Sequence, residues 1–255
     1  MGTPAINRYR WLAQYYDEFF SPFRSPIDAA RERALGRILP RVETACDLAC
    51  GSGTTALALA RKGIRVNAVD LSPLMCRITR EKVAQARLPV RVLRADMRSF
   101  RLPEPVDLVT CECDALNHVP RRHDLRKVVN AVERALRPGG YFFFDVNNSL
   151  GFERCWSGDI WLERPGVVIV MRNGHNRKAQ RAWIDIEWFI RDGSHWRRHH
   201  ECVEEVCWNP EEICRTLKEA GFHHTKSWDA APFFKGNPMI VPGCRTIYLA
   251  QKAVA

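Results

Sequence analysis

The sequence has no long run of apolar residues and no recognisable leader. No window approaches the roughly 18 uninterrupted apolar residues that a membrane-spanning helix needs. The first residues, Met1-Gly2-Thr3-Pro4, lack the charged segment followed by an apolar stretch that marks a secretion signal. Internal repeats and low-complexity stretches are also missing, which excludes solenoid and fibrous architectures. These absences predict a globular protein with no membrane partner.

Cysteine is plentiful, but the spacing that marks a metal site is lacking. The 255-residue chain has ten cysteines and no CxxC pair, and the nearest approach to one is Cys111 with Cys113. A chain of this length buries roughly 73% of its unfolded surface, so it needs no disulfide to fold. We therefore expect reduced, mostly buried thiols in a cytoplasmic protein, and no bound metal.

Lysine is scarce in a chain that is nevertheless basic. Of 39 basic residues, 8 are lysine and 31 arginine, and the net charge is +10 with a pI of about 9.3. Such a balance raises nucleic acid, an anionic membrane surface or an acidic substrate as partners. The arginines are dispersed, however, and only Arg121-Arg122 and Arg197-Arg198 form local pairs. We therefore do not expect a nucleic-acid partner, while an anionic small molecule stays open.

Short apolar segments alternate with amphipathic helical segments through the middle of the chain. This alternation predicts βαβ units and a parallel sheet. The expected strands are 44–48, 65–70, 90–94, 106–111 and 141–146. The expected helices are 53–61, 73–86, 124–136 and 210–220.

The flanking segments differ in their periodicity. Two helices are expected before the sheet, at 5–20 and 27–39. Strands at 167–171, 182–191 and 195–207 are separated by the dipeptides Asn173-Gly174 and Asp192-Gly193, which are strong hairpin signals. They predict an antiparallel ribbon inserted into the parallel sheet. Two last strands are expected at 222–228 and 246–251.

A glycine-containing loop follows the first expected strand and opens a helix. Gly51 and Gly53 allow backbone N–H groups to approach a ligand closely. Asp70 ends the second strand, where a carboxylate can bond both ribose hydroxyls. This arrangement fits any nucleoside-type cofactor, and Gly51-x-Gly53-x-x-Ala56 also satisfies the dinucleotide pattern. Asp47 argues against a pyrophosphate, which it would repel, and suits a cationic amino group.

Four motifs together carry a family resemblance. DLACGSG, VDLS, ADM and LRPGGYFFFD, in this order and spacing between residues 41 and 146, resemble the class I S-adenosylmethionine-dependent methyltransferases. The resemblance implies a Rossmann-like, doubly wound, mostly parallel seven-stranded α/β sheet. It also implies S-adenosylmethionine as cofactor and S-adenosylhomocysteine as product. One departure is Ala49, where the family often has glycine.

The same resemblance implies which residues contact the cofactor. Asp47, Ala49, Gly51 and Gly53 would take the methionine portion; Asp70 the ribose, flanked by Leu71 and Met75; Asp96 and the Met97 backbone the adenine; and Cys111, with Glu112, would line the floor through backbone contacts.

A second resemblance concerns the segment before the sheet and the insertion after its fifth strand. The N-terminal pattern Tyr9-x-x-Leu12-Ala13-x-x-Tyr16-Asp17 is similar to a subset of the family that modifies small molecules. In that subset a helix folds over the cofactor, and a β insertion after the fifth strand covers the substrate. It implies a helical lid at 1–40, a cofactor-binding domain at 41–150 and 209–255, and an inserted subdomain at 151–208 that covers substrate or forms a dimer. Tyr9 and Tyr16 are equally readable as core aromatics at helical spacing.

Candidate substrate-side residues follow the fourth and fifth strands. His118 has the intrinsic pKa of a general base, although a lone histidine is also a common packing residue. Asn147, Trp156 and Trp188 are candidates to contact substrate. The sequence thus predicts methyl transfer to an N or O atom of a small molecule. An RNA or protein methyltransferase and a non-catalytic cofactor-binding protein are the alternatives, and a monomer or homodimer is left open.

Overall fold

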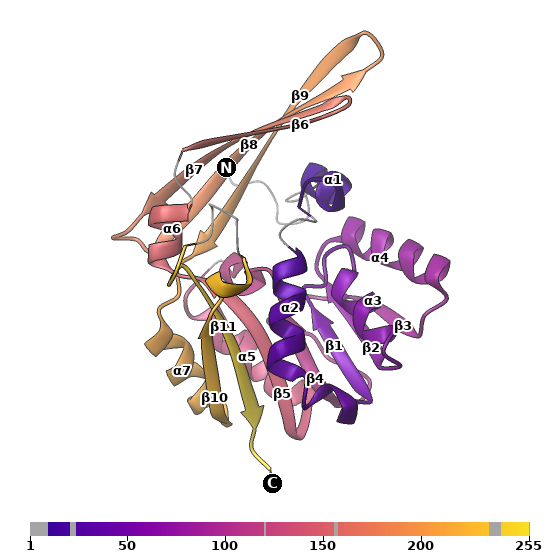
Figure 1. Ribbon diagram of the computed structural model, residues 1–255, viewed down its shortest axis with the longest axis vertical. Helices are drawn as coiled ribbons and strands as arrows, with labels where there is room; N and C mark the ends of the chain where they lie inside the picture. The colour runs from indigo at the N-terminus through magenta and orange to yellow at the C-terminus, as the bar shows by residue number, and fades with distance from the viewer. Residues whose placement is uncertain (1–9, 21–23, 120, 156–157, 235–240, 255) are drawn as a thin grey trace.

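A seven-stranded sheet forms the centre of the computed structural model, which describes residues 10–20, 24–119, 121–155, 158–234 and 241–254 (Figure 1). Its strand order is β10-β11-β5-β4-β1-β2-β3. The strands are β1 (Thr44–Leu48), β2 (Arg65–Asp70), β3 (Val90–Arg94), β4 (Val106–Cys111), β5 (Leu136–Asn147), β10 (Phe222–Asp229) and β11 (Arg245–Lys252). Only β11 runs against its neighbours β5 and β10, so the predicted mostly parallel sheet is confirmed.

Helices cover both faces of this sheet. On one face, α2 (Arg24–Leu35) and α3 (Thr54–Ala60) pack against β1, β2 and β5. On the other, α5 (Asp124–Ala135) and α7 (Pro210–Glu219) bury their apolar sides against β4, β5 and β11. Burial on both faces explains why the central strands are almost continuously apolar. The helix that connects β2 to β3 is α4 (Pro73–Ala86). Ser72 precedes it as the N-cap, and its hydroxyl accepts the Met75 N–H.

A separate four-stranded antiparallel sheet stands above the carboxyl ends of the parallel strands (Figure 1). It consists of β6 (Asp159–Arg164), β7 (Val167–Asn176), β8 (Arg181–Asp192) and β9 (His195–Val206). The short helix α6 (Ser149–Cys155) precedes it, and the lid helix α1 (Arg10–Phe20) packs on its inner face. Leu12 and Phe19 of α1 share a buried cluster with Ile169 and Trp188 of this sheet.

Several sequence predictions need correction. The predicted antiparallel ribbon is present in the chain between β5 and β10, but it forms a sheet of its own and includes a strand that the sequence did not predict, β6. Asn173-Gly174 is not a hairpin turn, because both residues lie within β7 and pair with Ile184 and Trp183. A β-carbon at Gly174 would lie 2.2 Å from the Trp183 ring, so this glycine serves a close cross-strand approach. The Asp192-Gly193 turn is confirmed: Asp192 pairs with His195, and Gly193 has a φ of 62°.

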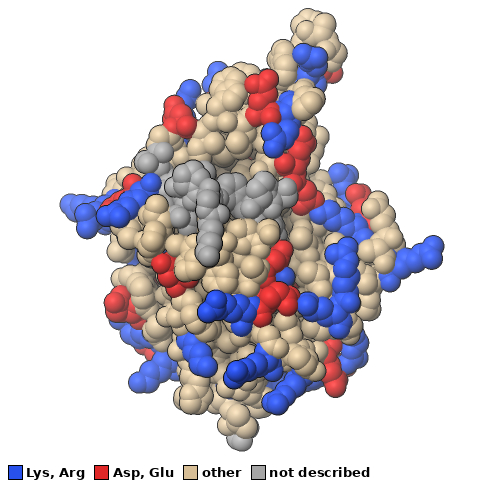
Figure 2. Space-filling view, viewed as in Figure 1, with Lys and Arg blue, Asp and Glu red and all other residues tan. Residues whose placement is uncertain are grey.

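Charged groups are mixed over the visible surface. Figure 2 shows Lys and Arg side chains spread over the face viewed, with acidic side chains between them. Six of the nine cysteines whose side chains are described are buried, and all nine are free thiols. In the described part of the chain, no helix has the length and apolar character to cross a membrane.

Candidate active site

A cavity of about 590 Å³ lies at the carboxyl ends of the parallel strands, roofed by α1 and the antiparallel sheet. Ten of the predicted site residues line it: Tyr16, Ala49, Gly51, Asp70, Leu71, Met75, Asp96, Met97, His118 and Asn147. Four others do not: Asp47, Gly53, Cys111 and Trp188. Tyr9 and Trp156 lie outside the described residues. The sequence therefore located the cavity, but four of the predicted residues do not border it.

The glycine loop between β1 and α3, residues 49–53, holds three left-handed residues in five positions. Ala49, Gly51 and Gly53 have φ values of 56°, 53° and 81°. A β-carbon on Gly53 would lie 2.5 Å from the Thr79 side chain, so Gly53 permits close packing of the loop on α4. A β-carbon on Gly51 would meet nothing within 4 Å and would enter the cavity. Gly51 therefore keeps space open for a ligand, whereas Gly53 serves the fold.

Asp70 joins the glycine loop to the start of α4. Its carboxylate accepts the Gly51 N–H at 2.9 Å and the Ser72 N–H at 2.8 Å. Burial raises the pKa of Asp70, although these backbone donors oppose the shift. Met75 and Leu71 border the cavity beside it, and Leu71 is 44% exposed. The ribose contact that the resemblance implies for Asp70 stays a prediction.

Asp96 borders the next part of the cavity, after β3. Arg98 grips it with its Nη2 2.6 Å from Oδ2, and the pKa of Asp96 is lowered chiefly by this contact. Arg98 also donates to the buried Asp124 at the start of α5. This part of the cavity wall, next to Met97, is thus an ion pair between Asp96 and Arg98.

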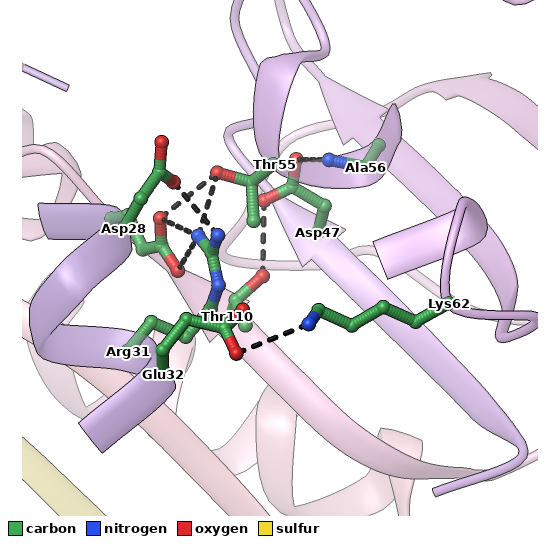
Figure 3. A network of polar contacts seen from close by, with 9 residues as sticks. Asp28, Arg31, Glu32, Asp47, Thr55, Ala56, Lys62 and Thr110 are labelled. Atoms are coloured by element: carbon green, nitrogen blue, oxygen red, sulfur yellow. Dashed lines mark hydrogen bonds and ion pairs between the residues drawn. The ribbon is translucent and has the colours of Figure 1, made fainter. Parts of the chain in front are cut away.

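Asp47 supports the glycine loop from inside. It is 2% exposed, and its carboxylate accepts the Ala56 N–H at 2.9 Å and the Thr110 hydroxyl at 3.0 Å (Figure 3). We therefore assign Asp47 to holding β1, α3 and β4 in register rather than to direct contact with a ligand. Cys111, fully buried in β4, likewise lies behind the cavity wall, while its neighbour Glu112 borders the cavity.

Glu112 is fixed by a buried ion pair. Arg31 of α2 donates to both Glu112 oxygens at 2.9 and 2.8 Å and to Asp28 at 2.7 Å. Thr55 adds a hydroxyl to Glu112 at 2.9 Å. Figure 3 shows Arg31 reaching from α2 toward Thr55, so this network joins α2 to the floor of the site. Arg31 is 1% exposed, which makes the pairing obligatory for the fold.

The far end of the cavity follows β4 and β5. Asp145 of β5, fully buried, accepts the N–H groups of Cys113 and Asp114 at 2.8 and 2.9 Å. Both residues have positive φ values, 58° and 52°, so Asp145 stabilises a strained turn. Arg245 of β11 bonds Asp145 at 2.7 Å and Asp114 at 3.2 Å. This turn leads directly to His118.

His118 borders the same end of the cavity. Burial lowers its pKa, against an opposing effect of Asp114 and a hydrogen bond to the Glu204 backbone. The imidazole is therefore neutral at neutral pH and able to accept a proton. Its Nε2 lies 3.8 Å from Oε1 of Glu205 in β9. Asn147 lies nearby and donates its amide to Asp114 at 2.6 Å.

The lid helix α1 is fastened at both ends. Glu201 of β9 accepts the N–H groups of Trp11 and Leu12 at 2.8 and 3.0 Å, as an N-terminal cap supplied by another element. At the other end, Asp17 accepts the Ser52 hydroxyl at 2.6 Å and forms an ion pair with Lys82. The lid thus connects the antiparallel sheet with the glycine loop.

Trp188 belongs to this lid contact rather than to the cavity. It is fully buried, donates its indole N–H to Glu201 at 3.1 Å and stacks on Tyr15 with ring centroids 5.7 Å apart. Its assignment to substrate contact is therefore replaced by a role in docking α1.

Sequence reasoning missed several residues of the site. The main ones are Arg98, Asp114, Glu201, Glu205 and Arg245. Glu201 and Glu205 share one face of β9 with Val203, and all three are buried. Two acids on the apolar face of a strand were the available signal. It was ambiguous, because Glu204 places a third acid on the opposite face.

The site fits a nucleoside cofactor with a cationic end. The space in front of Gly51 is open, and the described cavity wall carries six acids and two arginines, with both arginines paired to acids. A pyrophosphate would find no unpaired guanidinium on this described wall, whereas a sulfonium with an ammonium group suits its acidic lining.

Comparisons with known proteins agree. The family described as "Methyltransferase domain" matches residues 45–140. A putative methyltransferase, YqeM, of Bacillus subtilis is 29% identical over 178 residues, which are 69% of this chain and 72% of that protein. The structure of a S-adenosylmethionine-dependent methyltransferase from Clostridium acetobutylicum superposes with a TM-score of 0.79 at 25% identity, covering 96% and 99% of the two chains.

A further structure shares the fold at lower identity. S-adenosylmethionine-bound CalS10, an amino pentose methyltransferase from Micromonospora echinaspora, superposes with a TM-score of 0.74 at 20% identity, covering 99% and 100% of the chains. The chain is an S-adenosylmethionine-dependent methyltransferase with S-adenosylmethionine as its cofactor, and it is similar to the class I enzymes of this kind. As an enzyme, it does not fit the non-catalytic alternative.

Proposed function

We propose that this enzyme methylates an N or O atom of a small molecule. The observation that carries the proposal is the roof of the cavity. Leu12, Tyr16 and Phe20 of α1 close it from one side, and β6 to β9 close it from another. A roofed cavity encloses a small acceptor, whereas an RNA or a folded protein needs an open surface at the cofactor.

The chain's own residues prepare the acceptor end. When bound, the cofactor supplies a methyl group made electrophilic by its sulfonium. The apolar residues of α1 and the antiparallel sheet exclude water from that region. Asn147 orients the polar groups of the acceptor. The neutral His118 accepts a proton from an acceptor that arrives protonated.

The charge of the wall bears on the acceptor's own charge. Six acids border the cavity, and its two arginines already face Asp96, Asp114 and Asp145. The anionic acceptor suggested by the net charge of +10 therefore finds no support here. CalS10 is named as an amino pentose methyltransferase, and an amino pentose is a small molecule with a basic group rather than an anionic one, which supports the proposal.

The test follows the methyl group from a labelled cofactor. The protein is incubated with S-adenosylmethionine carrying a deuterated methyl group and an extract of bacterial cells, which is then separated by ultrafiltration. We expect the label in the small-molecule fraction, and its loss in an enzyme carrying His118→Ala that still binds S-adenosylhomocysteine. Label confined to RNA or protein would refute the proposal.

A further inference from the structure

Glu205 of β9 is a buried acid to which the proposed function gives no role. It is 2% exposed and borders the acceptor end of the cavity. Its Oε2 has no hydrogen-bond partner among the described residues. Leaving a buried carboxyl oxygen unpaired is costly, so a ligand that brings a donor to this atom gains affinity.

The groups around Glu205 leave this end of the cavity short of positive charge. The Asn147 amide bonds both Asp114 and Glu205. Arg245 is the cation facing them, and it divides its hydrogen bonds between Asp145 and Asp114. Three carboxyl groups thus share one guanidinium, since His118 is held neutral by burial. An incoming cation would correct this imbalance.

The state of Glu205 without a ligand agrees with this view. Burial, together with Asp114, raises the pKa of Glu205 well above its usual range. The carboxyl therefore keeps a proton in place of a cation.

We propose that Glu205 binds the ammonium group of the methyl acceptor as its counter-ion, so that the acceptor is an amine, while His118 takes the proton as in the proposed function. This inference rests on the proposed function. The ammonium group displaces the proton of Glu205, which leaves to solvent, and donates an N–H to the resulting carboxylate. A second ammonium proton moves to the neutral imidazole of His118, 3.8 Å from Glu205, and the N–H electron pair remains on nitrogen as the lone pair.

The neighbouring wall indicates what the rest of the acceptor resembles. Ile160, Leu162 and Ile184 of the antiparallel sheet border the cavity and offer no charge. A compact apolar body carrying one amine therefore suits this end. Cyclohexylamine is a probe of that kind, with cyclohexanol and cyclohexanecarboxylate as its neutral and anionic counterparts.

The test is calorimetric titration of the three probes into the full-length protein loaded with S-adenosylhomocysteine. We expect cyclohexylamine to bind at least about tenfold more tightly than cyclohexanol, a difference of about 1.4 kcal/mol, and the carboxylate to bind most weakly. Glu205→Gln keeps the shape of the side chain, and it should reduce the amine preference to less than about threefold. The matched control, Glu163→Gln, changes an exposed acid of β6 outside the cavity and should leave the preference intact.

The outcomes separate the two levels of the argument. If the wild-type protein does not bind S-adenosylhomocysteine, the proposed function itself fails. If it does bind it but shows no amine preference, or if Glu205→Gln retains the full preference, the role of Glu205 is overturned. Titration of the variant with S-adenosylhomocysteine checks that it is folded, and the wild-type comparison of amine with alcohol decides the matter even if it is not.

Discussion

Docking of the lid helix depends on one carboxylate, Glu201. Its side chain is 9% exposed and accepts three N–H groups, from Trp11, Leu12 and the Trp188 indole. The substitution Glu201→Ala removes the helix cap, worth about 0.5–2 kcal/mol, and leaves the buried indole N–H unpaired, which costs about 1–3 kcal/mol. We expect local opening of α1 to become easier by about 3 kcal/mol, on the order of 100-fold.

Hydrogen exchange of the α1 amides measures this opening. The informative amides are those of residues 15–19, because Glu201 does not bond them directly, so a change there reports detachment of the whole helix. Their protection should fall on the order of 100-fold in Glu201→Ala and less in Glu201→Gln, which keeps one carbonyl acceptor. The control Glu163→Ala should change nothing. Unchanged protection at residues 15–19 in Glu201→Ala would refute the view that Glu201 fastens the lid.

Three further predictions concern the loop and the buried acid. Gly51→Ala should fold, with about 1 kcal/mol of left-handed strain, but it should weaken S-adenosylhomocysteine binding at least about tenfold in calorimetry. Equal affinities of the wild type and Gly51→Ala would contradict this. Gly53→Ala, whose β-carbon would lie 2.5 Å from Thr79, should instead lower the free energy of unfolding by about 2 kcal/mol or more. Ala49→Gly relieves a φ of 56° and should raise that free energy by about 1 kcal/mol in urea denaturation, and a loss of stability would count against it. Glu205→Gln should stabilise the ligand-free protein increasingly as pH rises above about 4.3. The reason is that the raised pKa of Glu205 makes the folded wild type bind a proton that its unfolded state has released. Melting temperatures of the wild type and the variant that converge as pH rises would contradict this direction.

The part of the cavity wall formed after β1, β2 and β3 was predictable because its signals are local in sequence. Gly51, Asp70 and Asp96 each lie at the carboxyl end of a strand or within three residues of it, and parallel strands bring their carboxyl ends to one edge. β1 and β4 begin and end at the predicted residues, since strands buried on both faces form apolar runs with clear limits. Asp47 was correctly placed on β1, but no local pattern distinguishes a ligand contact from a carboxylate that bonds Ala56 and Thr110.

The end of the cavity after β4 and β5 was predicted only in part, through His118 and Asn147, because the rest of it is assembled from distant segments. Asp145 and Arg245 are separated by 100 residues in the sequence. His118 lies beside Glu205, which belongs to β9 of the other sheet. Asn173-Gly174 misled for a related reason. The dipeptide favours a turn locally, but β7 and β8 continue pairing past it, and the Trp183 ring requires the glycine. Tertiary contacts therefore decided the elements that local patterns could not.

A crystal structure of the complex with S-adenosylhomocysteine tests the central claim most directly. The account predicts the adenine beside Asp96 and Met97, the ribose at Asp70, and the sulfur directed toward His118 and Glu205 under a closed α1. An adenine bound instead at the Glu205 end, or a ligand outside the roofed cavity, would contradict it.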